Sequence, residues 1–354
     1  MGTYLLRRLL LVVPTLLGII AINFVVVQLA PGGPVEHVMA ELRGEGGMSV
    51  MSGAAADLGT AGAYRGASGL DPHMLADVRK MFGFDKPPLT RFLDMVGGYL
   101  RFDFGRSFFR GQSVLALIAE RLPVSLSLGL WSTLLVYAIS IPLGIRKAVR
   151  DGSRFDVATS TVVLVGYAVP SFLFAILLVV VFAGGSYFHW FPLRGLLSQG
   201  AASWSFPARA ANYAWHLVLP VAAVTAGGFA SLTMLTKNCF LEEIRKQYTV
   251  TARAKGAGER RVLYGHVFRN AMLLIVAGLP QAFVNMLFSS VLLVEIVFSL
   301  PGLGELGFQA AIQRDYPVMF GTLYIFTLIG LVMQIVGDVL YTVVDPRIHF
   351  GAHR

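Results

Sequence analysis

The chain has 354 residues, of which 55% are hydrophobic and only 14% are charged. Soluble domains carry about 25% charged residues, so this composition excludes an ordinary water-soluble enzyme. The formal net charge of +9 could suit a nucleic-acid partner, but in a membrane protein it is explained more simply by basic loops held on one side of the bilayer. We therefore expect an all-α integral membrane protein that contacts the lipid bilayer and binds no nucleic acid.

Six apolar stretches are long enough to cross about 30 Å of hydrocarbon as helices. They are Leu9 to Leu29, Val124 to Ile145, Val157 to Ala183, Leu217 to Thr236, Ala271 to Val294 and Val318 to Leu340. The first follows two arginines, as a secretion signal would, but its apolar core is too long for one. We expect residues 1–30 to remain as the first transmembrane helix, and 124–345 to form a core of five more.

Lysine and arginine are distributed unevenly between the two sides that these spans define. Sixteen of them lie on the side of both termini, against Arg194, Arg209 and Arg314 on the other side, when the long first loop is left out. Short loops rich in positive charge remain in the cytoplasm. Both termini, including a tail at 346–354, should therefore be cytoplasmic.

By the same count, residues 31–123 form one large extracytoplasmic excursion. Its part from Arg43 to Leu70 is rich in Gly, Ala and Ser and should form a mobile loop. Amphipathic segments follow near Met74 to Phe82 and Leu89 to Phe102. These segments predict a small helical module over the membrane.

The loop at 237–270, between the fourth and fifth predicted spans, carries the run T-A-R-A-K-G. Ala, Arg and Lys favour a helix, and the glycine lets the backbone turn at its end. Small side chains would let another protein approach the backbone, and basic ones would supply charge-assisted contacts. This pattern favours a docking segment over a catalytic centre. The residues expected to dock are Thr251, Ala252, Arg253, Ala254, Lys255, Gly256 and Arg260.

The sequence predicts no catalytic site. The phosphate-binding pattern G-x-x-x-x-G-K-[ST] and the zinc pattern H-E-x-x-H do not occur, so we expect the chain to bind no ATP, cofactor or metal of its own. The single cysteine, Cys239, cannot form an internal disulfide.

Ionisable and polar residues inside apolar spans are costly, which makes them candidates for a pathway or gate. Glu295 could take part in a transport pathway or form a structural pair with another side chain. Asn285 and Gln334 could line a polar path or join helices by hydrogen bonds. Asp338 is expected to pair with a cytoplasmic arginine. Prolines 142, 170 and 280 should bend the helices that contain them.

Several motifs, in order along the whole chain, resemble the B-type permease of oligopeptide and dipeptide ABC importers. The motifs are F-D-F-G-R-S from Phe102, R-L-P-V-S from Arg121, T-A-R-A-K-G-A-G-E-R-R from Thr251, S-L-P-G-L-G from Ser299, R-D-Y-P from Arg314 and D-P-R-I from Asp345. P-G-G-P from Pro31 and the Gly-rich insert resemble the Yej-type branch associated with microcin C and oligopeptide uptake.

The resemblance implies a type I ABC importer permease fold in the bacterial inner membrane. It also implies a second homologous permease subunit, two ATPase subunits that bind ATP and Mg, and an extracytoplasmic peptide-binding protein. The run from Thr251 resembles the EAA loop of such importers, a coupling helix seated in the ATPase. The acidic residue and the Leu-Pro ending of the general loop are not matched, which leaves contacts beyond Gly256 open.

Three other functions stay open at this point. The coupling loop does not report cargo, so nickel or another small solute is an alternative to peptides. An ion-coupled secondary transporter would need ion-coordinating groups near the bilayer centre and inverted repeats, and neither is visible. A membrane scaffold without transport is the third.

Overall fold

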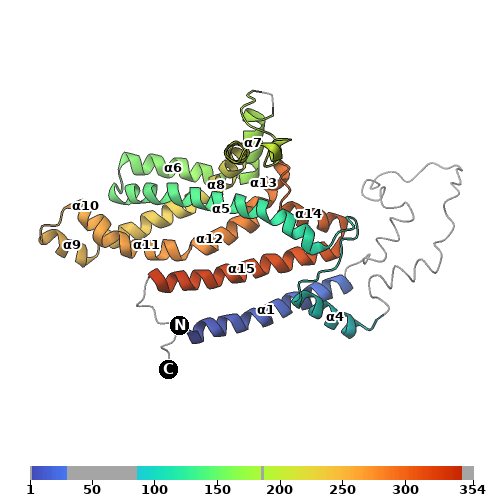
Figure 1. Ribbon diagram of the computed structural model, residues 1–354. Coiled ribbons are helices and arrows are strands. Elements are labelled where there is room, and N and C mark those ends of the chain that lie inside the picture. The colour runs from blue at the N-terminus through green and yellow to red at the C-terminus, as the bar shows by residue number, and fades with distance from the viewer. Residues whose placement is uncertain (1, 30–85, 185–186, 345–354) are drawn as a thin grey trace, which may run out of the picture. The chain divides into compact units, whose positions relative to one another are not determined.

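A computed structural model describes residues 2–29, 86–184 and 187–344, which are almost entirely helical (Figure 1). The Gly-rich stretch 43–70, the amphipathic stretch 74–82 and the tail 346–354 lie outside the described residues. The α-helices are α1 (Gly2–Leu29), α4 (Pro88–Leu100), α5 (Val114–Val149), α6 (Arg154–Ala168), α7 (Ser171–Phe182), α8 (Phe206–Ile244), α9 (Gln247–Ala254), α10 (Glu259–Val262), α11 (Phe268–Ala277), α12 (Leu279–Asn285), α13 (Val291–Val297), α14 (Leu303–Gln313) and α15 (Tyr316–Val344). A 3₁₀ turn (Ala201–Ser203) and two π-helical segments, η2 (Leu263–Val267) and η3 (Met286–Ser290), interrupt or join them.

Five helical stretches among the described residues are long and apolar enough to cross a membrane. They are Leu6–Val26, Val114–Val149, Phe206–Ile244, Glu259–Val297 and Tyr316–Val343. Each corresponds to one of the six predicted spans, and four of them are longer than predicted. The amphipathic segment predicted from Leu89 is present as α4.

The predicted third span, Val157 to Ala183, differs from a single straight helix. It consists of α6 and α7, which are bent by 93° relative to each other. Val169 has an extended backbone (φ −85°, ψ 117°) because the ring of Pro170 excludes the helical conformation for the residue before it. The prediction of six spans is therefore confirmed only if this bent pair counts as one crossing.

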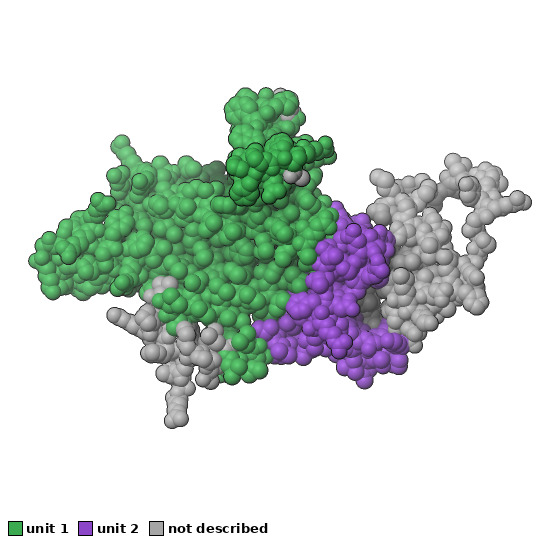
Figure 2. All heavy atoms as spheres, in the orientation of Figure 1, with its two compact units in different colours: residues 1–10, 118–306, 325–354 green, residues 11–117, 307–324 purple. Residues whose placement is uncertain are grey.

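The chain divides into two compact units (Figure 2). Unit 1 consists of 1–10, 118–306 and 325–354, and unit 2 of 11–117 and 307–324. In unit 1, α8 packs against α6, α7 and α11, around fully buried side chains such as Leu128, Phe240 and Ile275. Helices α5 and α8 are in tight contact at Gly144, because a Cβ there would lie 2.9 Å from the carbonyl oxygen of Thr233.

Unit 2 is held together by an aromatic cluster and one buried carboxylate. Tyr99 lies edge-on to Phe104 and to Tyr324, with ring centroids 5.0 and 5.5 Å apart. The Asp315 carboxylate accepts hydrogen bonds from the Ser107 hydroxyl at 2.5 Å and from the Phe108 N–H at 3.4 Å. The F-D-F-G-R-S motif is thus fixed to the start of α15.

Candidate functional site

The turn from α8 into α9 is fixed by side chains of its own residues. The fully buried Thr249 hydroxyl lies 2.8 Å from the carbonyl oxygen of Ile244 and 2.7 Å from that of Lys246. Glu243 accepts a 2.6 Å hydrogen bond from the Tyr248 hydroxyl and pairs with Lys246. The hydrogen bond to Glu243 raises the pKa of Lys246, and burial raises that of Tyr248. The start of α9 is therefore tied rigidly to α8.

The end of α9 confirms the predicted glycine stop. Gly256 has φ +83°, a conformation that glycine adopts without strain. Its N–H donates to the Arg253 carbonyl at 2.8 Å, and the Ala257 N–H donates to the Ala252 carbonyl at 3.1 Å. These two bonds form a Schellman motif, which satisfies carbonyls that the helix end would leave open.

The predicted docking residues divide into outward and inward groups. Thr251, Ala254, Lys255, Gly256 and Arg260 are exposed. Ala252 instead packs, half-buried, against the hydrophobic core of unit 1. It therefore supports α9 from beneath.

Arg253 is exposed but engaged within the chain. Its Nε lies 2.8 Å from Glu259 Oε1 and its second nitrogen 3.1 Å from Oε2, a bidentate pair. Glu259 raises the pKa of Arg253. The pair closes the loop between α9 and α10, a role that the sequence reasoning missed although Glu259 lies only six residues further on.

A basic hollow of about 480 Å³ lies between α9 and the chain that follows it. Its lining residues are Tyr248, Thr251, Ala252, Lys255, Gly256, Ala257, Arg261 and His266. In the part of the chain that the structure describes, Lys255 and Arg261 form no ion pair, unlike Arg253 and Lys246. These two positively charged side chains, which lie beside a histidine, favour contact with an acidic partner.

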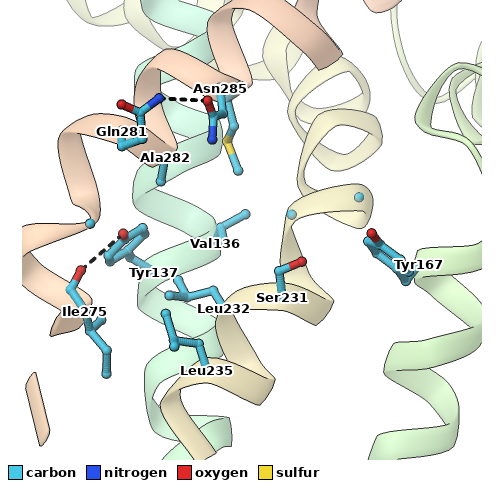
Figure 3. A pocket seen from close by; sticks show the side chains of 14 residues that line it. Val136, Tyr137, Tyr167, Ser231, Leu232, Leu235, Ile275, Gln281, Ala282 and Asn285 are labelled. Atoms are coloured by element: carbon cyan, nitrogen blue, oxygen red, sulfur yellow. Dashed lines mark hydrogen bonds between the residues drawn. The ribbon is translucent and has the colours of Figure 1, made fainter. Parts of the chain in front are cut away.

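A second cavity, of about 620 Å³, lies among α5, α6, α8, α11 and α12 (Figure 3). Its walls are mostly apolar and include Val136, Leu232 and Ile275, and its polar lining consists of Tyr137, Tyr167, Ser231, Gln281 and Asn285. The cavity therefore offers amide and hydroxyl groups but no charged side chain.

The predicted pathway residue Asn285 lines this cavity. Gln281 donates a 2.9 Å hydrogen bond to its Oδ1, and the Tyr137 hydroxyl donates to the Ile275 carbonyl at 3.3 Å (Figure 3). Gln281 and Asn285 are both exposed although they lie within a spanning stretch. Polar groups in that position face a watery path or another subunit more favourably than lipid. The sequence reasoning missed Gln281, although its i,i+4 spacing from Asn285 places both on one helix face.

Glu295 and Gln334 lie elsewhere. Glu295 is fully buried, and its carboxylate accepts hydrogen bonds from the Ser125 hydroxyl and from the Glu305 N–H, the latter at 3.0 Å. The Ser125 hydroxyl in turn accepts from the Leu303 N–H at 2.8 Å. This arrangement satisfies open N–H groups at the start of α14, as a helix cap does. Gln334 is exposed on α15 and is not among the residues that line the cavity.

Asp338 pairs with an arginine, as predicted. Its Oδ2 lies 3.1 Å from the Nε of Arg8. The pair joins the ends of α1 and α15 that belong to unit 1.

Comparison with known proteins identifies the family of the chain. Residues 140–350 match the family described as "Binding-protein-dependent transport system inner membrane component". The chain is 56% identical to the peptidoglycan transport system permease protein YejB of Agrobacterium fabrum and 58% identical to the inner membrane ABC transporter permease protein YejB of Escherichia coli O157:H7, over 99% of both chains in each case. It is 33% identical to the oligopeptide transport system permease protein AppB of Bacillus subtilis, over 99% of this chain and 100% of AppB.

Two solved structures share the fold. Chains of the MetNI methionine ABC transporter in inward-facing conformations match with TM-scores of 0.50 and 0.51, at 19% and 18% identity. Each match covers 65% of this chain and 97% or 96% of the other. The fold is thus that of a type I ABC importer permease. With the family match over more than half of its length, the chain belongs to the inner-membrane permease components of binding-protein-dependent ABC importers.

Proposed function

We propose that this permease takes up peptides across the bacterial inner membrane, driven by ATP hydrolysis in partner subunits. The observation that carries the proposal is full-length similarity to the YejB proteins and to AppB, whose name specifies oligopeptide transport. These names favour peptides over nickel or another small solute as cargo.

The parts of the chain would divide the work as follows. Residues 31–123 form the extracytoplasmic part that receives a peptide-binding protein, and 124–345 form the transmembrane core beside a second homologous permease. The loop 237–270 contacts one of two ATPase subunits, which bind ATP and Mg. The tail 346–354 is cytoplasmic. This chain itself holds no cofactor.

Helix α9 is the proposed ATPase contact. Its exposed residues Thr251, Ala254, Lys255 and Gly256 would face the partner, and Arg260 would extend the contact onto α10. The Schellman motif and the pair between Arg253 and Glu259 hold this surface in one shape before it docks. A preorganised surface binds more tightly because less conformational freedom is lost on contact.

The uncharged cavity around Gln281 and Asn285 supports the choice of cargo. Amide and hydroxyl groups can exchange hydrogen bonds with a peptide backbone, which every peptide presents. A path lined by no fixed charge does not discriminate between acidic and basic side chains by attraction or repulsion. It therefore suits peptides of varied sequence.

A second cargo is favoured by one observation. The Agrobacterium fabrum relative is named for peptidoglycan transport, which would make the peptides of cell-wall fragments the substrates. Peptide conjugates such as microcin C are a third class, implied by the Yej-type resemblance. All three share a peptide backbone.

Uptake by the purified complex in proteoliposomes tests the proposal. A labelled tripeptide, a cell-wall tripeptide and nickel would be offered with the binding protein, with and without ATP inside. We expect ATP-dependent accumulation of at least one peptide and none of nickel. Accumulation without ATP, or of nickel alone, would overturn the proposal.

The docking surface is tested by charge reversal. The double variant Lys255→Glu, Arg261→Glu should weaken co-purification of the ATPase by about tenfold or more, since like charges at a contact cost several kcal/mol. Gly166→Ala is a matched control, because nothing lies within 4 Å of a Cβ added there. Unchanged co-purification and uptake in the double variant would remove α9 as the docking site.

A further inference from the structure

Five charged side chains from α5, α6, α8 and the turns beside them form an ion cluster: Lys147, Asp151, Asp156, Lys237 and Arg245. Lys147 is at its centre and is fully buried. Its Nζ lies 3.0 Å from Asp156 Oδ1 and donates hydrogen bonds to the Asp156 carbonyl at 2.9 Å and the Ser160 hydroxyl at 2.7 Å. The ammonium of Lys147 is thus surrounded by acceptors from α6.

Asp156 and Asp151 connect this centre to α8. Asp156 Oδ2 lies 2.7 Å from Lys237 Nζ and accepts from the Gly152 N–H at 3.1 Å. Asp151 Oδ1 lies 2.9 Å from the same ammonium, and its Oδ2 lies 3.5 Å from Arg245. Lys237 therefore bridges two carboxylates that belong to α6 and to the turn before it.

The cluster is costly to build. A buried ion pair gives up hydration that its mutual attraction only partly returns, and apolar residues of equal volume would often stabilise the fold as well or better. Ion pairs have a different advantage, because their directional contacts fix the position of one helix relative to another. Stability alone does not account for burying Lys147 and Asp156, whereas Asp151 and Arg245 at the rim of the cluster are exposed.

The cluster has a direct connection to α9. From Lys237, α8 continues without a break to Ile244, and the contacts of Thr249 and of Glu243 with Tyr248 fix the turn into α9. On its other side, α9 is followed by α10 and by the π-helical segment η2. A displacement of α9 can therefore reach α5 and α6 through α8 and the ion cluster.

We propose that the ion cluster is the joint through which a displacement of α9 moves α5 and α6. Lys237 and Asp156 are then positioning residues for transport, which act on the path without touching cargo or ATP. This inference rests on the proposed function, because it takes α9 as the ATPase contact.

The test measures the number of ATP molecules hydrolysed per peptide transported in proteoliposomes that hold the whole complex. A fraction of the complex that is fully inactive neither hydrolyses ATP nor transports peptide, so it leaves this ratio unchanged. Lys237→Met removes both bridging ion pairs but leaves Asp156 its contact with Lys147. We expect the ratio to rise between about twofold and thirtyfold, the range seen when residues that couple two sites are changed.

Two further variants keep the test decisive. Lys237→Arg retains the charge and should hold the ratio near that of the wild type. Asp151→Asn alters the partly exposed rim of the cluster, where a folding defect is not expected, and should raise the ratio less than Lys237→Met. If Lys237→Met fails to assemble, the ratio measured for Asp151→Asn tests the proposal in its place.

If the number of ATP molecules hydrolysed per peptide is unchanged in the assembled variants, the ion cluster does not transmit the displacement of α9. The proposed function would then still stand. Failure of the proposed function would look different, because the wild-type complex itself would then not couple peptide uptake to ATP hydrolysis.

Discussion

A charged residue inside a spanning helix suggests a role in transport. Glu295 shows that such a residue can instead have a structural role. Its two carboxylate oxygens take hydrogen bonds from the Ser125 hydroxyl and from the backbone at the start of α14. Gly302 leaves the space for this arrangement, because a Cβ there would lie 2.1 Å from the Glu295 carboxyl carbon. The S-L-P-G-L-G motif thus combines a glycine with the carboxylate that caps the next helix.

At this scale we predict that Gly302→Ala is destabilising. The added methyl group would force the Glu295 carboxylate away and leave the Glu305 N–H and the Ser125 hydroxyl without their acceptor, at about 1–3 kcal/mol for each. A lower midpoint of thermal unfolding in detergent would show it. Gly166→Ala, in open space, should match or exceed the wild type because alanine favours the helix by about 0.5–1 kcal/mol. Equal melting of Gly302→Ala and wild type would contradict the capping role.

At the scale of the elements, α5 and α8 cross in tight contact at Gly144. Association of helices in membranes relies on close backbone approach at small residues. Gly144 provides it, since an added Cβ would lie 2.6 Å from the Cβ of Thr236 and 2.9 Å from the backbone of Thr233. The crossing lies near the ion cluster in sequence, three residues before Lys147 on α5 and one before Lys237 on α8.

We predict that Gly144→Ala forces α5 and α8 apart. Backbone and Cβ atoms cannot rotate out of the way as the end of a side chain can, so overpacking should cost about 1–3 kcal/mol. The fraction that stays monodisperse in detergent after heating would measure the loss. Gly18→Ala serves as a control, because its added Cβ has nothing within 4 Å. If Gly144→Ala tolerates heating as well as the control does, the contact between α5 and α8 can adjust to the added methyl group, and the prediction is wrong.

Local signals in the sequence were sufficient for some elements. The end of α9 follows from the run that stops at Gly256, and α4 follows from the amphipathic pattern at Leu89, because each depends on residues within one turn or face. The sharpness of the bend at Pro170 does not follow from its neighbours, because α7 also packs against α8 and α13.

The candidate site was predictable only in part, for the same reason. The run from Thr251 to Arg260 marked the docking segment, but its division into outward cations and an inward pair depends on where Glu259 folds. The ion cluster was not predicted. Lys237 and Asp156 are 81 positions apart, and no local pattern brings such residues together.

At the scale of the whole molecule, the ion cluster bears on topology. It joins the end of α8 to the turn between α5 and α6, so these two places lie on one side of the membrane. With 39 residues, α8 is about 58 Å long and exceeds the roughly 40–45 Å of a complete bilayer. The chain must therefore return across the membrane between the end of α5 and the start of α8, and among the described residues there the bent pair α6–α7 is the part that is long and apolar enough to do so.

Single cysteines labelled by a membrane-impermeant maleimide test this topology. In a Cys239→Ser background, Arg150→Cys at the end of α5 and Lys255→Cys after α9 should react only in inside-out vesicles. Ser205→Cys, at the start of α8, should react only in right-side-out vesicles, because the bent pair has carried the chain across. The excess of lysine and arginine around positions 150 and 255 gives the same direction. If positions 150 and 205 reacted only in inside-out vesicles and position 255 only in right-side-out vesicles, then α6 and α7 would form a re-entrant segment, and α9 could not reach an ATPase in the cytoplasm.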